Sequence, residues 1–146
     1  MRNILCILTF ALMLFPSCEG NGTGRDGDWD PIKFDHNEFT IPANGGTVYS
    51  KVLNYNGIWL NDMKVTKEGL KDSEPEYFVP SLDEHLNYNY DSLSCKYAKL
   101  SVSKEKNPVI KIEVAPNNEQ ETLLMRIGVE CGDAFSSIII HQNPAK

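Results

Sequence analysis

The chain has 146 residues, a length typical of one domain, and 41% of them are apolar and 10% aromatic. This apolar content excludes a wholly disordered chain, which would bury too little surface to offset the entropy lost on folding. The formal net charge is −6, and lysine and arginine do not cluster in any window, so we expect no nucleic-acid partner.

The amino terminus has the pattern of an export signal. Arg2 provides a positive charge, and residues 4–15 form an uncharged apolar run. A run of this length is typical of a secretory signal peptide, whereas a membrane-spanning helix needs about 20 apolar residues. The sequence therefore predicts a signal peptide over residues 1–17, with a retained membrane helix as the alternative.

Cys18 follows this run in a context that resembles the lipidation motif of bacterial lipoproteins. Ser17 is the small residue expected before the cysteine, but Phe15 and Pro16 replace the leucine and the small residue usual at the two preceding positions. We expect acyl chains on Cys18 to attach the mature chain to a membrane, with ordinary signal-peptide cleavage as the alternative. The Gly-rich residues 18–28 are typical of a flexible tether, and the sequence leaves open which leaflet of the outer membrane holds the anchor.

The tether contains alternating carboxylates that partly match a calcium-binding loop. Asp26, Asp28 and Asp30 have the spacing of its first ligands. Pro31 and Asn37, however, stand at the sixth and twelfth positions, where such a loop needs glycine and glutamate. We therefore expect no metal site here.

From Trp29 onward, short segments of alternating polarity are separated by Gly, Asn and Pro, which is typical of an antiparallel sandwich. The clearest segment is VIKIEV, whose aliphatic residues face one way and charged residues the other. We expect an all-β, Ig-like antiparallel β-sandwich of about seven strands over residues 29–144. The expected strands are residues 39–41, 47–55, 58–65, 96–103, 109–114, 122–131 and 135–142.

The remaining segments are less regular. Residues 66–94 contain charged residues, prolines and an aromatic-rich stretch, and we expect long loops with one short strand at residues 77–79. Gly132 and Asp133 predict a two-residue hairpin turn. The three consecutive isoleucines at 138–140 indicate burial on both faces of the last strand, or an interface.

Two sets of apolar residues are expected in the core. Trp59 is expected there because Ig-like sandwiches commonly bury a tryptophan of the third strand, with stacking on a sugar as the alternative. The other set consists of the alternate residues of strand 122–131, namely Leu123, Met125, Ile127, Val129 and Cys131.

Cys95 and Cys131 are the only cysteines of the expected mature chain besides Cys18. Export places them in an oxidising or neutral compartment, so a disulfide between them is one interpretation. It could form only if their Cα atoms approach within about 7 Å. The alternative is that Cys131 serves as a small apolar residue of its strand.

No group of residues predicts catalysis. His36, His85 and His141 are far apart and lack the spacing of a zinc site. Asp83 and Glu84 lie in an expected loop rather than on two rigid strands that face one cleft. We therefore expect a protein that is not an enzyme and has no cofactor.

Several short motifs together resemble the BACON-like β-sandwich modules of Bacteroidetes lipoproteins. In chain order they are Trp29-Asp30-Pro31, Ala43-Asn44-Gly45-Gly46, Asn54-Tyr55, Trp59-Leu60, Val114-Ala115-Pro116-Asn117, Arg126 and Ile140-His141-Gln142. The resemblance implies a noncatalytic, seven-stranded module on a cell-surface or periplasmic protein, for which glycan binding and a spacer role have both been proposed. Here the module stands without a glycosidase, and residues 66–94 match none of the family's motifs.

Four aromatic residues are candidates for stacking on a sugar. Tyr77, Tyr88 and Tyr90 are expected in a loop, and Trp29 lies at the entrance of the domain. A ring held in solvent offers an apolar face to the C–H groups of a pyranose. Local packing of these rings is the alternative.

Together these observations predict a lipid-anchored, noncatalytic protein of the cell envelope that binds a polysaccharide or a mucin glycan. The alternative is a structural spacer, or a module that contacts other envelope proteins.

Overall fold

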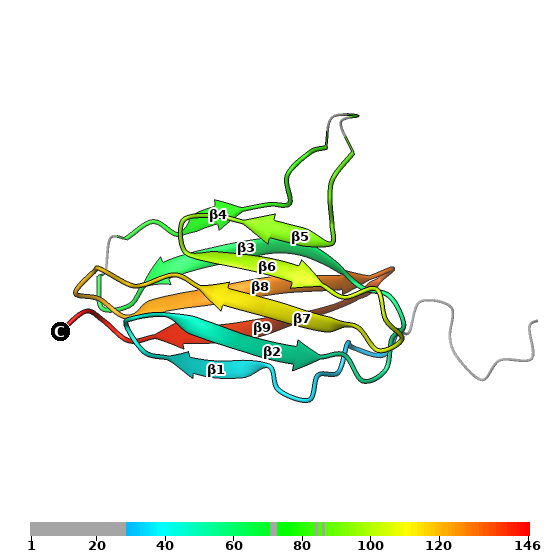
Figure 1. Ribbon diagram of the computed structural model, residues 1–146, viewed down its shortest axis with the longest axis horizontal. Coiled ribbons are helices and arrows are strands. Elements are labelled where there is room, and N and C mark those ends of the chain that lie inside the picture. The colour runs from blue at the N-terminus through cyan, green and yellow to red at the C-terminus, as the bar shows by residue number, and fades with distance from the viewer. Residues whose placement is uncertain (1–28, 71–72, 84, 86) are drawn as a thin grey trace, which may run out of the picture.

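The computed structural model describes residues 29–70, 73–83, 85 and 87–146, and these residues form nine strands in two stacked sheets (Figure 1). The predicted signal peptide, the predicted lipidation site Cys18 and the predicted tether lie outside the described residues. The strands are β1 (Glu38–Ile41), β2 (Gly46–Lys51), β3 (Trp59–Lys67), β4 (Glu76–Phe78), β5 (Ser92–Ser94), β6 (Ala98–Val102), β7 (Val109–Val114), β8 (Leu123–Cys131) and β9 (Ala134–Gln142).

The order of the strands is that of an Ig-like sandwich. One sheet has the order β1-β9-β8-β3-β4 and the other β2-β7-β6-β5. The neighbours β9, β8 and β3 correspond to strands G, F and C of the immunoglobulin fold, and β2, β7 and β6 to strands B, E and D. All pairs are antiparallel except β1 with β9. The prediction of an all-β, Ig-like sandwich is therefore confirmed.

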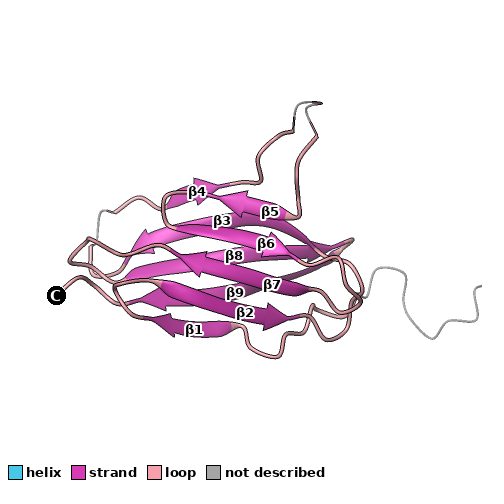
Figure 2. Cartoon of the chain, viewed as in Figure 1, coloured by secondary structure: helices cyan, strands magenta, loops and turns pink. Residues whose placement is uncertain are grey.

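Strands and loops account for all of the chain that the structure describes (Figure 2). Within that part there is accordingly no helix of the length and apolarity needed to cross a membrane.

The core lies between the sheets and is built from alternate residues of the long strands. In β8 the residues Leu123, Met125, Ile127 and Val129 are at most 1% exposed, as their alternation predicts. In β9, Ile138 and Ile140 are fully buried, whereas Ile139 points outward and is half-buried between its partners on β1 and β8. Each fully buried aliphatic side chain contributes about 1.5–3 kcal/mol to folding.

Trp59 does not lie in this core, so its predicted position is wrong. Leu60, its neighbour on β3, is 0% exposed and points inward. Because successive side chains of a strand point to opposite faces, Trp59 must then point outward, and it is half-buried there. Its register partner on β8 is Glu130, which in turn pairs with Phe135 on β9.

Several predicted boundaries also differ from the structure, and one strand was not predicted. The strand expected over residues 47–55 ends at Lys51, because the chain then turns to pair with the segment before β1: Leu53 donates its N–H to Lys33 O, and Asn54 accepts from Lys33 N. In the region expected to be mostly loop, β4 lies close to the short strand predicted at residues 77–79, and β5 was not predicted.

The chain between β4 and β5 projects away from the sheets (Figure 1). We call its described residues, 79–83, 85 and 87–91, the arm. Its two limbs pair through Leu82 and Tyr88 and through a hydrogen bond from Asn89 N to Ser81 O. Asp83 closes its tip, since its Oδ1 accepts the N–H of Asn87 and of His85.

Candidate functional site

The outer face of the β1-β9-β8-β3-β4 sheet carries a hollow of about 320 Å³, which we call the outer-face groove. This volume lies at the lower end of the range of small-molecule pockets. Four strands contribute to it: β3 and β8 form the floor, and β4 and β9 lie to either side. Its lining includes the side chains of Asn61, Asp62, Lys64, Tyr77, Arg126 and Phe135, together with Gly128.

The floor of the groove is open because position 128 has no side chain. Gly128 pairs with Asp62 on β3, and a Cβ at position 128 would lie 2.3 Å from Asp62 Oδ1. The carboxylate of Asp62 therefore lies over the backbone of Gly128. Glycine inside a strand often marks such a close approach of another group.

Aromatic rings stand at opposite sides of the groove. Tyr77, on the edge strand β4, is 61% exposed, and Phe135, at the start of β9, is 58% exposed. Since β3 and β8 lie between their strands, the two strand axes are about 14 Å apart. The rings are also offset by about 13 Å along the strands, because Tyr77 is level with Ile139 in the register and Phe135 precedes Ile139 by four residues. A ligand between the rings can contact an apolar face at each end.

Polar side chains lie between the rings. Asn61 and Asp62 offer an amide and a carboxylate. An apolar ring face beside hydrogen-bonding groups is the combination that a sugar requires, because a pyranose has C–H groups on its faces and hydroxyls around its rim.

Two cations complete the floor. Lys64 on β3 is the register partner of Arg126 on β8 and of Tyr77 on β4. The Nζ atom of Lys64 lies 5.7 Å from the centroid of the Tyr77 ring, within cation–π range. This contact holds the lysine and the ring side by side.

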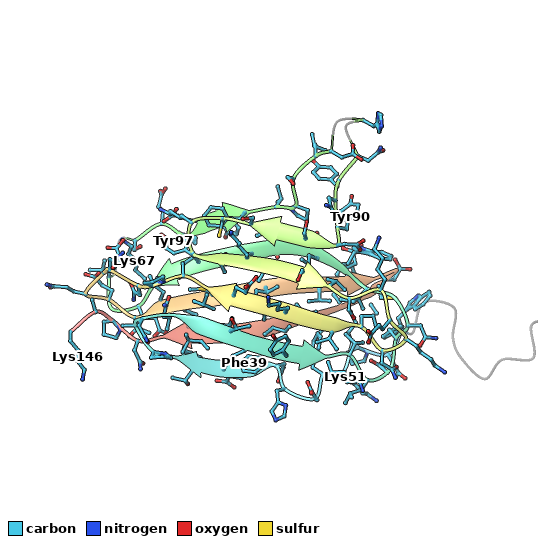
Figure 3. All side chains as sticks on the ribbon, in the orientation of Figure 1. Phe39, Lys51, Lys67, Tyr90, Tyr97 and Lys146 are labelled. Atoms are coloured by element: carbon cyan, nitrogen blue, oxygen red, sulfur yellow. The ribbon has the colours of Figure 1, made fainter. Side chains whose placement is uncertain are left out.

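The four aromatic residues predicted to stack on sugar lie in three different places. Tyr77 alone lines the outer-face groove. Tyr88 and Tyr90 are on the arm, with ring centroids 5.6 Å apart, and the carbonyl of Tyr90 accepts the N–H of Leu60. Figure 3 shows Tyr90 near the base of the arm. Trp29 covers Gly132 in the β8–β9 turn, where a Cβ on the glycine would lie 3.7 Å from its ring.

Sequence reasoning missed Phe135, Lys64 and Gly128 as members of a site. Each occupies an outward position of a strand that was predicted, so the faces could be read from the alternation. What the pattern could not supply is the order of the strands, which brings the residues together.

Cys95 and Cys131 are free thiols, so the disulfide considered from the sequence is not formed. Cys95 follows β5 in the four-stranded sheet, beside the start of β6, whereas Cys131 ends β8 in the other sheet. The two cysteines lie at opposite ends of the sandwich. Cys95 is at the end where β8 begins, and Cys131 is at the end where β8 stops. Burial raises the pKa of the Cys131 thiol, as expected for a small inward-facing residue.

The histidines lie apart from the groove and from one another. His36 is beside Asp35, with Nδ1 3.7 Å from Oδ2, and His141 is 3.4 Å from Glu38 at the β1–β9 pair. Among residues 29–70, 73–83, 85 and 87–146, no three His, Cys, Asp or Glu side chains form a group that could hold a metal ion. Asp83 serves the turn of the arm, and its bond from Asn87 N–H lowers the pKa of its carboxyl.

Comparison with solved structures shows what the chain is similar to in fold. The NMR structure of a protein from Bacteroides thetaiotaomicron matches with a TM-score of 0.58 and 22% sequence identity, over 89% of this chain and 99% of that chain. The structure of murine CRIg matches with a TM-score of 0.36 and 15% identity, over 79% of this chain and 97% of that one. No protein-family model matches the chain, and neither does any curated protein. The first similarity supports the fold alone, and the second is too weak to support an argument.

Proposed function

We propose that the protein is a noncatalytic, lipid-anchored envelope protein that binds a glycan in the outer-face groove. The observation that carries this proposal is the pair of exposed rings, Tyr77 and Phe135, on either side of a polar floor. Rings in this arrangement stack on sugars while the floor exchanges hydrogen bonds with hydroxyls. The anchor is proposed from the position of Cys18 directly after an apolar export signal.

The rigid position of the site supports the proposal. Every side chain of the groove stands on or beside a strand whose inward neighbours are buried in the core, so its backbone is fixed. Binding groups on such elements lose less entropy when a ligand is bound than groups on loops do.

A glycan array probed with the full-length protein tests the proposal. We expect retention of at least one polysaccharide or mucin glycan, and a loss of affinity of tenfold or more in Tyr77→Ala and in Phe135→Ala. The control is Tyr49→Ala, since Tyr49 is 57% exposed but lies on β2 of the other sheet. If no glycan is retained, or if the control weakens binding as much as the groove variants, the proposal is wrong.

The proposed anchor has its own test. Growth of the source bacterium with a radiolabelled fatty acid should label the wild-type protein and leave Cys18→Ser unlabelled. The unlabelled variant should also leave the membrane fraction. Labelling of Cys18→Ser would contradict the assignment of the lipid to this residue.

A second candidate function is contact with another envelope protein through the arm. Four apolar residues of the arm are strongly exposed: Val79 by 62%, Leu82 and Tyr88 by 49% each, and Tyr90 by 45%. An apolar projection of this kind is typical of a protein contact. A photo-crosslinking residue at Leu82 should trap one defined protein in intact cells, whereas the same residue at the equally exposed Leu53 should not. Equal trapping at both positions would contradict this function.

A further inference from the structure

The outer-face groove contains two like charges that face each other. Lys64 and Arg126 are directly opposite in the register of β3 and β8, and both point outward because their neighbours along each strand are buried. Like charges directly opposite on adjacent strands destabilise a sheet. The two cations therefore repel each other here, and this pairing does not stabilise the fold.

No carboxylate of the described residues forms an ion pair with either cation. Asp62 shares the groove, but its carboxylate lies over Gly128 and is not within ion-pair distance of Lys64 or Arg126. Among the described residues, the ammonium group of Lys64 lies over the ring of Tyr77 and forms no ion pair or side-chain hydrogen bond. Two cations and one separate carboxylate thus give the groove a positive end, in a chain whose net charge is −6.

The other sheet shows the opposite arrangement. There Lys99 on β6 faces Glu113 on β7, and Lys111 forms an ion pair of 3.0 Å with the same glutamate. The cations of these two strands therefore lie beside a carboxylate, as is usual for cross-strand pairs. The unmatched pair is confined to the face that carries the groove.

We propose that the outer-face groove takes an acidic saccharide, with the anionic substituent of one sugar unit against Lys64 and Arg126. This inference rests on the proposed glycan-binding function and names the class of glycan. The planar guanidinium of Arg126 suits two parallel hydrogen bonds to a carboxylate or a sulfate ester. The ring of the same sugar then lies beside Tyr77, whose position next to Lys64 is fixed by the cation–π contact.

Asp62 sets the orientation of such a ligand. A carboxylate repels the anionic substituent from the Gly128 end of the groove and accepts hydrogen bonds from neutral hydroxyls instead. The acidic group is thereby directed to the Lys64 and Arg126 end. Because the whole chain is acidic, the attraction is local, and binding weakens as salt screens it.

Matched saccharides test the inference on the full-length protein. The probes are tetra-galacturonate, its methyl ester, in which the same rings carry no charge, and a sulfated galactose tetramer. We expect at least tenfold tighter binding of an anionic probe than of the ester. Tighter binding of the galacturonate assigns a carboxylate, and tighter binding of the sulfated probe assigns a sulfate.

The variants are Lys64→Gln and Arg126→Gln, with Lys99→Gln on the other sheet as the matched control. The first two should abolish the preference for the anionic probe, and the control should keep it. The midpoint of urea unfolding should stay unchanged or rise in Lys64→Gln and Arg126→Gln, because each removes the repulsion between the two cations.

The outcomes separate the inference from the function on which it rests. If the ester or other neutral saccharides bind as tightly as the acids, or if the preference survives both substitutions, the inference is wrong and glycan binding stands. If no saccharide of any charge binds, the proposed function fails and the inference fails with it.

Discussion

Replacing Gly128 with alanine should close the floor of the outer-face groove without weakening the fold. The backbone of Gly128 is not in the left-handed region, so alanine can adopt its conformation. A Cβ there would lie 2.3 Å from Asp62 Oδ1. This oxygen is the end of a partly exposed side chain, which can rotate away, whereas the new methyl group stays in the groove.

The expected change in the free energy of unfolding of Gly128→Ala follows from two opposed effects. Glycine in a strand is less stable than alanine by about 0.5–1 kcal/mol, so the substitution should raise the free energy of unfolding by up to that amount. The side chain of Asp62 forms no hydrogen bond or ion pair with another described residue, so its rotation offsets little of this gain. Glycan affinity should fall tenfold or more, which is about 1.4 kcal/mol.

Gly45→Ala is the matched control, because it adds the same methyl group but should lower the free energy of unfolding. Gly45 has a φ of +80°, and its Cβ would lie 2.4 Å from the carbonyl oxygen of Val114, which is backbone and cannot rotate away. The left-handed conformation costs alanine about 1–2 kcal/mol, and overpacking adds about 1–3 kcal/mol.

Urea unfolding of both variants and titration calorimetry of Gly128→Ala with the retained glycan measure these effects. If Gly128→Ala loses as much stability as Gly45→Ala, the side chain of Asp62 does not rotate away from the new methyl group, and this prediction is wrong. If Gly128→Ala binds the glycan as the wild type does, the glycan does not occupy this groove.

Two further predictions concern polar groups at the ends of the sandwich. Asn117 is 4% exposed and donates through Nδ2 to the carbonyl oxygens of Glu121 and Asn143, at 3.0 Å each, so Asn117→Ala should lower the free energy of unfolding in urea by about 1–3 kcal/mol. An unchanged value would mean that water replaces the amide. The hydroxyl of Tyr97 donates to Glu76 and lowers the pKa of that carboxyl below 4.5, so the pair adds stability above the unfolded pKa and loses it as pH falls through the folded pKa. Tyr97→Phe should therefore flatten the dependence of stability on pH below about 4.5 in acid unfolding followed by circular dichroism, and an unaltered acid dependence would contradict this.

The strands that could be predicted are those with two unlike faces. The predicted ranges 109–114 and 122–131 agree with β7 and β8 to within one residue, because aliphatic and polar side chains alternate throughout both. The strand β5 has three residues and one buried side chain, Leu93, which is too short a pattern to read. Local alternation therefore determines the long strands, while short edge strands depend on their neighbours.

The groove could not be predicted in the same way, because its members meet only through the strand order. Tyr77 and Phe135 are far apart in the sequence, and Lys64 meets Arg126 only because β3 pairs with β8. Trp59 shows the converse error. A rule about the third strand of Ig-like folds placed it in the core, although the alternation with Leu60 already placed it on the outer face.

One feature of β3 can be recognised in the sequence: the alternation of inward and outward side chains shifts by one residue along the strand, which we call a change of phase. Leu60 points inward at an even position, whereas Met63 and Val65 point inward at odd positions. A strand with a side-chain period of two can keep all three in the core only if one extra residue is inserted between them. The irregular register between Leu60 and Asp62 is this insertion, a β-bulge.

The bulge also determines where the groove lies. The extra residue gives the outer face two consecutive polar side chains, Asn61 and Asp62, and both line the groove. They stand opposite Gly128, the one position of β8 without a side chain to fill the space. The same insertion that keeps the inward residues of β3 in the core therefore supplies the polar floor on the other side of the sheet. A change of phase within a strand, facing a glycine on the next, is thus a signal for a surface site that alternation alone does not reveal.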